Sequence, residues 1–222
     1  MKTGEAHGVL KCTVDIETWG GPNKPTADDI KVPGNYKKPE AIDNYIKENL
    51  PDAWKKNAVQ SLKGEIVCIG YAFTNDPPQT IIGTEEAIMD GFVNALIQEG
   101  VTHLTQVYWI GHNLAGFDLP WLLHRAWKYG NRLLLDTIPT NRYDDHVVDT
   151  MSIWAATGRD YYKLGEIAKF LGIGSKGGID GSMIHDMFVE GRISEIAQYC
   201  EVDVDLTRTL SKILKPEIWI SS

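Results

Sequence analysis

The 222-residue sequence lacks the features that mark membrane-spanning, secreted and disulfide-bonded proteins. No run approaches the ~18 consecutive apolar residues that a membrane helix needs. Residues 1–8 lack the apolar stretch of a secretory signal. Cysteine is rare, and its three positions are far apart and without zinc-binding Cys-x-x-Cys spacing: Cys12, Cys68 and Cys200. We therefore expect reduced thiols in a cytoplasmic protein that has no membrane contact.

Positive charge is also scarce. The chain has 22 Lys and Arg against 30 Asp and Glu, a net charge of −8. A balance of this sign argues against a protein that holds nucleic acid by a uniformly basic surface. The charge is uneven, because seven lysines and four acids between positions 31 and 63 give this segment +3 and leave −11 elsewhere. Bound divalent metal would offset part of that negative charge if the acids cluster.

What the chain does contain is a regular order of β-rich and helical segments. Strands are expected at Gly8–Ile16, Glu65–Phe73, Thr80–Gly83, Gln106–Gly111 and His146–Asp149. Helices are expected at Glu85–Gln98, Asp118–Lys128, Tyr162–Leu171 and Ile193–Leu214. This order predicts an α/β fold with a mixed central β-sheet flanked by helices, in a single domain spanning residues 1–222.

An insertion at about residues 20–63 separates the first two predicted strands. It opens with loop-forming residues and continues with two expected helices, Glu40–Asn49 and Asp52–Leu62. We interpret it as an appendage near the end of the first strand, and its relative basicity makes it a candidate substrate grip. Tyr45 and Trp54 would either stack on unpaired bases or anchor the helices to the body, and the anchoring interpretation is favoured. The lysines that could contact phosphates are Lys37, Lys38, Lys55, Lys56 and Lys63.

The first candidate motif is the pair Asp15 and Glu17 at the end of an apolar strand. Side chains at positions i and i+2 of a strand share a face, so the two carboxylates would project together beside buried residues. Two unpaired carboxylates there would be costly, and a divalent cation bound through oxygen removes that cost. Taken alone, the pattern is more typical of a polar strand end that enters a loop.

The second motif runs from Gly111 to Asp118, between a predicted strand and a predicted helix. Asp118 is either the cap of that helix or a third carboxylate delivered beside the first two. Gly111 and Gly116 would let the backbone pass close to a ligand.

The third motif lies in the last helix, where Asp203 occupies a position at which an apolar residue is expected. The stripe has a 3,4,3,4,3 spacing through Ile196, Tyr199, Asp203, Leu206, Leu210 and Ile213. An inward carboxylate needs a partner, which is either a metal ion or hydrogen bonds with Tyr199, one turn earlier on the same face. Glu201 and Asp205 would point elsewhere, into solvent.

Together, the segments DIET, NLAGFD and YCEVD resemble the three exonuclease motifs of the DnaQ-like, or DEDD, superfamily. Tyr199 with Asp203 matches the tyrosine form of the third motif, so the resemblance is to the DEDDy branch. The region from position 164 to 207 is also similar to predicted stand-alone exonucleases of bacteria and phages, which are related to the proofreading domain of B-family DNA polymerases. The resemblance extends from Gly8 to about Leu214.

The resemblance implies a ribonuclease-H-like fold and hydrolysis with two divalent ions, Mg²⁺ or Mn²⁺. Asp15 would bridge both ions, and Glu17 and Asp203 would complete the site of the ion that activates the attacking water. Asp118 would hold the second ion partly through water, and Tyr199 would orient the nucleophilic water. The expected catalytic residues are thus Asp15, Glu17, Asp118, Tyr199 and Asp203, and the four acids are the expected metal ligands.

Substrate contacts are expected from the first two motifs and from a glycine-rich loop. The candidates are Ile16, Thr18, His112, Asn113, Phe117 and Lys176. His112 would contact the terminal nucleotide or be a packed, hydrogen-bonded histidine. The loop at 172–178 contains a GxGxxG pattern, but it follows a helix rather than a strand and therefore indicates a helix stop. Asp149 would support the site or cap the segment that follows it.

The motifs and the resemblance thus predict a metal-dependent 3'–5' exonuclease that releases 5'-nucleotides. The resemblance to proofreading domains of DNA polymerases favours single-stranded DNA ends as the substrate. An RNA-trimming enzyme and a catalytically idle nucleic-acid-binding module of the same fold are the alternatives. A cation-binding or interaction protein without catalytic activity is a third. No polymerase or helicase partner can be read from the residues.

Overall fold

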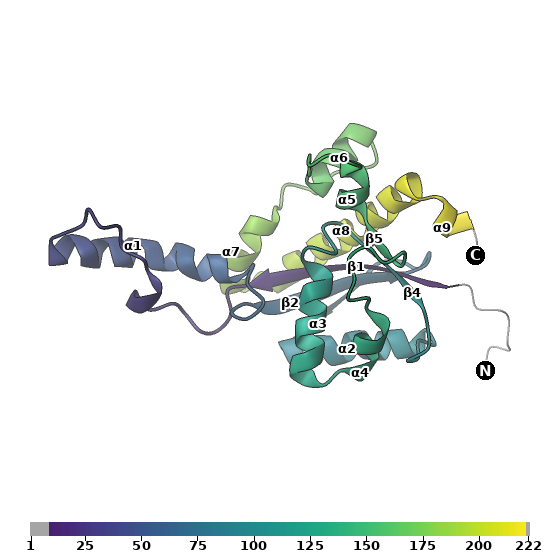
Figure 1. The fold of residues 1–222 in the computed structure, drawn as a ribbon, viewed down its shortest axis with the longest axis horizontal. Coiled ribbons are helices and arrows are strands. Elements are labelled where there is room, and N and C mark those ends of the chain that lie inside the picture. Colours follow the sequence, from purple (N-terminus) through teal and green to yellow (C-terminus); the bar gives the residue numbers. More distant parts are fainter. Residues whose placement is uncertain (1–8, 221–222) are drawn as a thin grey trace.

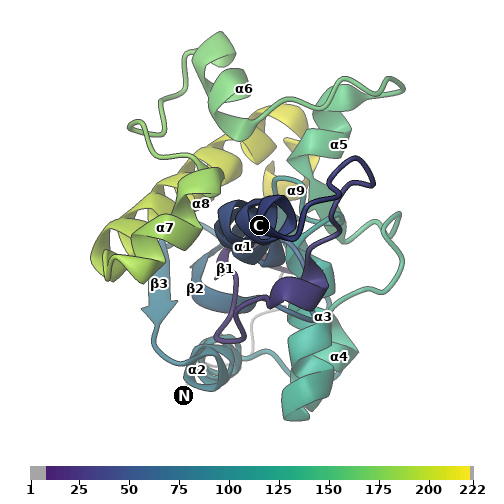
Figure 2. The same cartoon turned by 90° about the vertical axis from the view of Figure 1, so that its left-hand side faces the viewer.

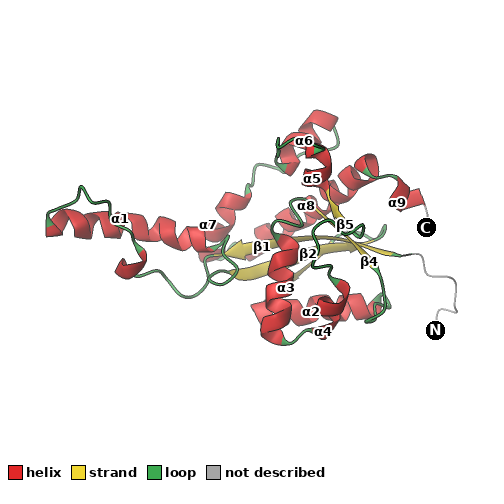
Figure 3. Ribbon diagram, in the orientation of Figure 1, coloured by secondary structure: helices red, strands yellow, loops and turns green. Residues whose placement is uncertain are grey.

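A five-stranded mixed sheet forms the centre of the protein (Figures 1 and 3). The computed structural model describes residues 9–220, so the polar start of the chain and the predicted strand start at Gly8 lie outside the described residues. The strands are β1 (Leu10–Trp19), β2 (Glu65–Phe73), β3 (Gln79–Ile82), β4 (Val107–Gly111) and β5 (Val147–Asp149). Their order is β3-β2-β1-β4-β5. β1 pairs antiparallel with β2 and parallel with β4, as a mixed sheet requires.

Helices cover both faces of this sheet (Figures 1 and 2). They are α1 (Pro39–Asn57), α2 (Glu85–Gln98), α3 (Asp118–Tyr129), α4 (Arg132–Thr137), α5 (Thr150–Ala155), α6 (Leu164–Leu171), α7 (Ile184–Val189), α8 (Ile193–Leu214) and α9 (Glu217–Ile220), with 3-10 turns at Ala27–Asp29 and Gly181–Met183. The sequence analysis did not predict α4, α5, α7 and α9. Within residues 9–220, no helix has both the length and the apolar composition to cross a membrane.

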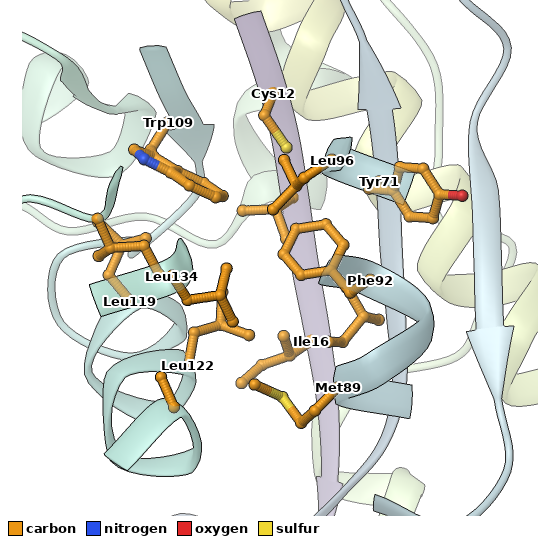
Figure 4. Close-up of a cluster of buried hydrophobic side chains, with 14 of the residues drawn as sticks. Cys12, Ile16, Tyr71, Met89, Phe92, Leu96, Trp109, Leu119, Leu122 and Leu134 are labelled. Atoms are coloured by element: carbon orange, nitrogen blue, oxygen red, sulfur yellow. The ribbon is translucent and has the colours of Figure 1, made fainter. Parts of the chain in front are cut away.

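The main hydrophobic core lies between the sheet and helices α2, α3 and α4 (Figure 4). Ile16 of β1, Phe92 of α2 and Leu122 of α3 are buried together there. Burial of a side chain of this size contributes about 1.5–3 kcal/mol. Alternate residues of β1 therefore supply this core, and the residues between them face α8 on the other side of the sheet.

Gly70 sets how closely α8 approaches the sheet. It lies opposite Asp15 in the β1–β2 register, and a Cβ atom there would come within 2.7 Å of the Cys200 sulfur and 3.1 Å of Val204. A glycine inside a strand often marks such a close approach. α8 consequently lies directly over the part of β1 that carries Asp15.

The insertion forms an arm, residues 20–63, that projects beyond the end of β1 (Figure 1). Two helices were expected here, and this was wrong: α1 runs continuously through Pro51. Proline removes one backbone N–H, which a helix tolerates at the cost of a local distortion. Trp54 packs edge-on against Trp19 and donates its indole N–H to the Gly21 carbonyl at 2.8 Å. Trp54 thus anchors the arm, as the favoured interpretation predicted.

Candidate active site

Asp15 and Glu17 lie on the same face of β1, within the strand rather than at its end, because β1 continues to Trp19. The pairing with β2 shifts register between Glu17 and Thr18, an irregularity of the kind that re-aims side chains beside functional sites. Oxygen atoms of Asp15, Glu17 and Asp203 lie within 4.8 Å of one another. The first strand and the last long helix therefore bring three carboxylates to one point.

Asp118 reaches the same region from the N-terminus of α3. It is the first residue of the helix, with Phe117 in the capping position, so it does not act as the cap. Its Oδ1 accepts the backbone N–H of Ile16 at 3.0 Å, and its side chain is buried. This hydrogen bond ties the second motif to the middle of the first.

The α8 stripe is confirmed for five of its six positions. Ile196, Tyr199, Asp203, Leu206 and Leu210 are buried. The exception is Ile213, which is 48% exposed. Asp205 is exposed and pairs with Arg208. Glu201 was expected to be solvated, but it is half-buried and accepts the Thr80 hydroxyl at 3.1 Å.

The four acids carry raised pKa values because they are buried close together. Burial and, secondarily, the neighbouring Asp203 raise the pKa of Asp15 to about 7. Burial and the charge of Asp15 raise the pKa of Glu17 and of Asp118 well above their ordinary values. Burial also raises the pKa of Asp203, and the nearby Lys176 opposes that shift. Such a group cannot be fully ionised without added positive charge.

Lys176 supplies part of that positive charge. Its Nζ lies 2.5 Å from Oδ2 of Asp203 and 4.8 Å from the centre of the Tyr199 ring. The other oxygen of Asp203, Oδ1, is buried and has no hydrogen-bond partner among the described residues. A buried oxygen left without a donor, beside two further carboxylates, fits the oxygen ligands that Mg²⁺ and Mn²⁺ prefer.

These residues surround a cleft of about 260 Å³. It is lined by the four acids, by Tyr199 and by five of the six expected substrate contacts: Ile16, His112, Asn113, Phe117 and Lys176. Thr18 does not line it, because its hydroxyl donates to the Ala58 carbonyl at 2.5 Å. Lining residues that the sequence analysis did not identify are Met151, Lys163, Leu164, Asp180 and Gly181. A second cleft, of about 280 Å³, lies within the arm and contains none of the motif residues.

His112 is a packed, hydrogen-bonded histidine in the wall of the cleft. Its Nδ1 lies 2.9 Å from the Thr150 hydroxyl, and its Nε2 lies 3.0 Å from the Tyr162 carbonyl. Burial lowers its pKa, which favours the neutral ring. With both ring nitrogens engaged, His112 fixes the wall and leaves only its ring surface for a ligand.

Asp149 both caps the following helix and supports the second motif. Its carboxylate accepts the backbone N–H groups of Met151 and Ser152 in α5, and those of Asn113 and Ala115 in the motif loop. Asn113 has a positive φ of 63°, a conformation that this network holds in place. The two interpretations of Asp149 therefore hold together.

The glycines of the second motif serve the packing of their own loop. A Cβ atom at Gly111 would come within 2.7 Å of the Leu114 side chain. At Gly116 it would come within 2.4 Å of the Asn113 side chain. We expected these glycines to let the backbone approach a ligand. Their surroundings show instead that they make room for side chains of the same loop. In the glycine-rich loop at 172–178, Gly172 ends α6 in the left-handed conformation, as the helix-stop interpretation predicted.

Comparison with known proteins identifies the class of this fold. The structure is similar to a family B DNA polymerase from the hyperthermophilic archaeon Pyrobaculum calidifontis, with a TM-score of 0.62 and 16% sequence identity. The match covers 99% of this chain and 26% of the polymerase, so this chain spans about a quarter of that protein. The fold is α/β and ribonuclease-H-like, with a mixed five-stranded sheet between helices.

Residues 79–210 match a protein family described as a predicted 3'-5' exonuclease related to the exonuclease domain of PolB. This match covers more than half of the sequence, and the chain belongs to that family. No curated protein has a significantly matching sequence. The matched segment contains Asp118, Tyr199 and Asp203, whereas Asp15 and Glu17 lie outside it.

Proposed function

We propose that this protein is a metal-dependent 3'–5' exonuclease that hydrolyses single-stranded DNA from its 3' end and releases 5'-nucleotides. The observation that carries the proposal is the convergence of four acids on one cleft, with an Asp203 oxygen buried and unpartnered. A protein that only binds nucleic acid has no need for four clustered carboxylates, three of them buried and Asp15 half-buried, because such a cluster destabilises the fold unless a cation is bound. Membership of the exonuclease family supports the same activity.

Asp15, Glu17 and Asp203 are the residues we propose to hold one divalent ion, with Asp15 shared and Asp118 on the side of a second. Two such ions would lower the pKa of the attacking water and stabilise charge on the leaving oxygen. The pKa of Tyr199 is raised, mainly by burial and then by the neighbouring Asp203. Tyr199 therefore keeps its proton at neutral pH, and its hydroxyl is suited to orient a water molecule or a phosphate oxygen.

Lys176 has the position and charge to receive substrate. Its ammonium group lies in the cleft beside Asp203 and would pair with a phosphate oxygen once the carboxylates bind cations. Among the substrate contacts predicted from the sequence, it is the residue that carries a positive charge.

A nuclease assay on matched 5'-labelled single-stranded DNA and RNA oligomers tests the proposal. We expect a ladder that shortens from the 3' end in Mg²⁺ or Mn²⁺, faster on DNA, and no cleavage in chelator. Asp15→Asn should abolish it, and Asp205→Asn, a change of the same type at an exposed position on α8, should not. Equal cleavage in chelator, or internal cuts in place of a ladder, would refute the proposed mechanism. Faster cleavage of RNA would overturn the substrate preference alone.

A further inference from the structure

We propose that the loop at residues 156–163, between α5 and α6, is a stacking platform for unpaired bases of the strand whose 3' end enters the cleft. Tyr161 and Tyr162 would form the platform, each ring lying against a base. This inference rests on the proposed function, because it takes single-stranded nucleic acid as the substrate. It adds a binding surface outside the cleft that holds the four acids.

The loop ends at the wall of the cleft, and α5, the helix before it, also reaches that wall. Met151 in α5 and Lys163 and Leu164 at the start of α6 all line it. The backbone between them is fixed at one further point, where the Tyr162 carbonyl lies 3.0 Å from Nε2 of His112. Figures 1 and 2 show α5 and α6 on the same side of the sheet as α8, which carries Asp203. The loop therefore forms part of the rim that a strand must cross.

Both rings are open to solvent. Tyr161 is 60% exposed and Tyr162 is 46% exposed. Within residues 9–220, neither ring is paired with another aromatic ring or with a cation, whereas the exposed Phe170 on α6 packs against Trp154. Tyrosine offers a large, rigid contact surface that loses little conformational entropy on binding. Two adjacent exposed tyrosines beside a cleft therefore have the character of a binding surface rather than of a folding core.

The dimensions and charge of the cleft explain why a platform is needed. Its volume of about 260 Å³ lies below the ~300–1,000 Å³ of pockets that enclose drug-sized ligands. It is therefore too small to enclose a strand, and all of the strand beyond its 3' end must lie over the rim. Without bound metal, the acids of the cleft outnumber its lysines, so phosphates gain little attraction from its walls. Stacking on aromatic rings binds bases of any sequence without requiring a basic groove.

The charged residues of the loop are consistent with this path. Arg159 is exposed and has no ion-pair partner in the described part of the chain, so it is available to a phosphate of the bound strand. Lys163 is already paired with Asp180 at 2.7 Å. The loop thus offers two rings and one available cation to the strand, an arrangement typical of single-strand binding surfaces.

The test is the affinity of the full chain for a 5'-fluorescein-labelled 12-nucleotide single strand, measured by anisotropy in chelator and in Ca²⁺. We expect Tyr161→Ala/Tyr162→Ala to weaken binding at least tenfold, and the corresponding double change to Phe to leave it within twofold. The matched control is Tyr143→Ala, because Tyr143 is 82% exposed beside Arg142 on the loop before β5, outside the cleft lining. A weakening by Tyr143→Ala as large as that of the double variant would overturn the proposal.

Oligomers with one abasic site at each of positions 2 to 6 from the 3' end separate stacking from a general loss of affinity. The wild-type protein should lose affinity at one or two of these positions, and the double Ala variant should show no further loss there. Wild-type binding that is insensitive to base removal, or equal losses in both proteins, would refute the platform. The cleavage ladder of the wild-type protein is read in parallel. If the protein cleaves the strand but its binding does not depend on the bases, the platform is refuted and the proposed function stands. If the protein neither cleaves nor shows base-dependent binding, the proposed function is refuted.

Discussion

One buried acid, Glu85, contrasts with the four acids of the cleft in how the protein compensates its charge. Glu85, the first residue of α2, accepts hydrogen bonds from the Ile66 N–H, the Arg125 guanidinium, the Lys128 ammonium and the Tyr129 hydroxyl. Burial would raise its pKa, but these donors outweigh burial and lower it. Glu85 is therefore satisfied by the protein itself, and its role is to hold α2, α3 and the start of β2 together.

The cleft acids have the opposite balance. Asp15, Glu17, Asp118 and Asp203 face one another, with Lys176 as the cation that pairs with them. Their pKa values are raised because burial and mutual repulsion exceed the stabilisation that the available donors supply. The comparison shows that burial of a carboxylate does not by itself indicate a ligand site. The shortage of donors does, because it leaves charge that a bound cation or a proton must compensate.

The largest expected effect is on activity, at Asp203. Asp203→Asn should lower the nuclease rate about a thousandfold or more, since it removes a ligand from a site that supplies several kcal/mol to the transition state. In chelator the same change should leave the melting temperature nearly unchanged, because the relief of repulsion among the four acids offsets the loss of the ion pair with Lys176. A matched fall in melting temperature in chelator would show that Asp203 is structural, like Glu85.

Glu85→Gln should lower stability and leave metal binding unchanged, the reverse of Asp203→Asn. Removing this charge leaves Arg125 buried without its counter-ion, which costs about 3 kcal/mol or more of unfolding free energy. For a chain of this size that corresponds to a fall of about 6–12 °C in melting temperature. Binding of Mn²⁺, followed by calorimetry below the melting transition, should be unchanged. A loss of Mn²⁺ affinity equal to that of Asp203→Asn would erase the distinction between the two groups.

The pH dependence of stability should also distinguish the cleft acids from Glu85. The folded-state pKa of Asp15, about 7, lies above its ordinary value of 3.8, so the folded protein binds more protons than the unfolded chain between those values. In chelator, the cleft should therefore make the protein less stable as pH rises from about 4 to 7. Saturating Mn²⁺ should reduce or reverse this trend, because metal binding displaces the protons. Melting curves at several pH values check it, and Glu85→Gln should retain the cleft-dependent trend.

The smallest expected effect concerns Lys176. Lys176→Met should lower stability in chelator by about 1.5–3 kcal/mol, the contribution of a hydrogen bond to a charged partner. It should also enlarge the gain in melting temperature that Mn²⁺ produces, since more charge then remains for the ion to neutralise. Lys55→Met is the control, because Lys55 is also 2.5 Å from its partner, Asp186, but that pair is exposed. Equal responses of the two variants would contradict a specific role for Lys176.

Much of the fold could be predicted, because several elements have sharp chemical boundaries. The structure reproduces the predicted bounds of β2, α2 and α8, which are flanked by turn residues or by residues that begin and end helices. The helices α4, α5 and α7 span six residues each, too few turns for a periodic pattern to emerge. The prediction divided α1 into two helices because proline usually ends a helix. In the structure α1 continues through Pro51.

The site was predictable as far as individual side chains carry its chemistry. The inward position of Asp203 follows from the apolar spacing around it, and the shared face of Asp15 and Glu17 follows from strand geometry. The donor set of Glu85 and the network of Asp149 depend on residues far apart in the chain, which no local pattern joins. The close approach of α8 to Gly70 could have been predicted from one feature of the sequence, a glycine in the middle of a strongly β-forming segment.

The span between Asp15 and Asp203 has a mechanical consequence. These residues are 188 positions apart in the sequence, and their carboxylates meet at one point. An ion held there would act as a removable cross-link between β1 and α8, with the constraint of a long-range disulfide but released by a chelator. Hydrogen exchange in β1 and α8 should therefore slow together when metal is added. Metal supply would then set the protein's resistance to unfolding as well as its activity.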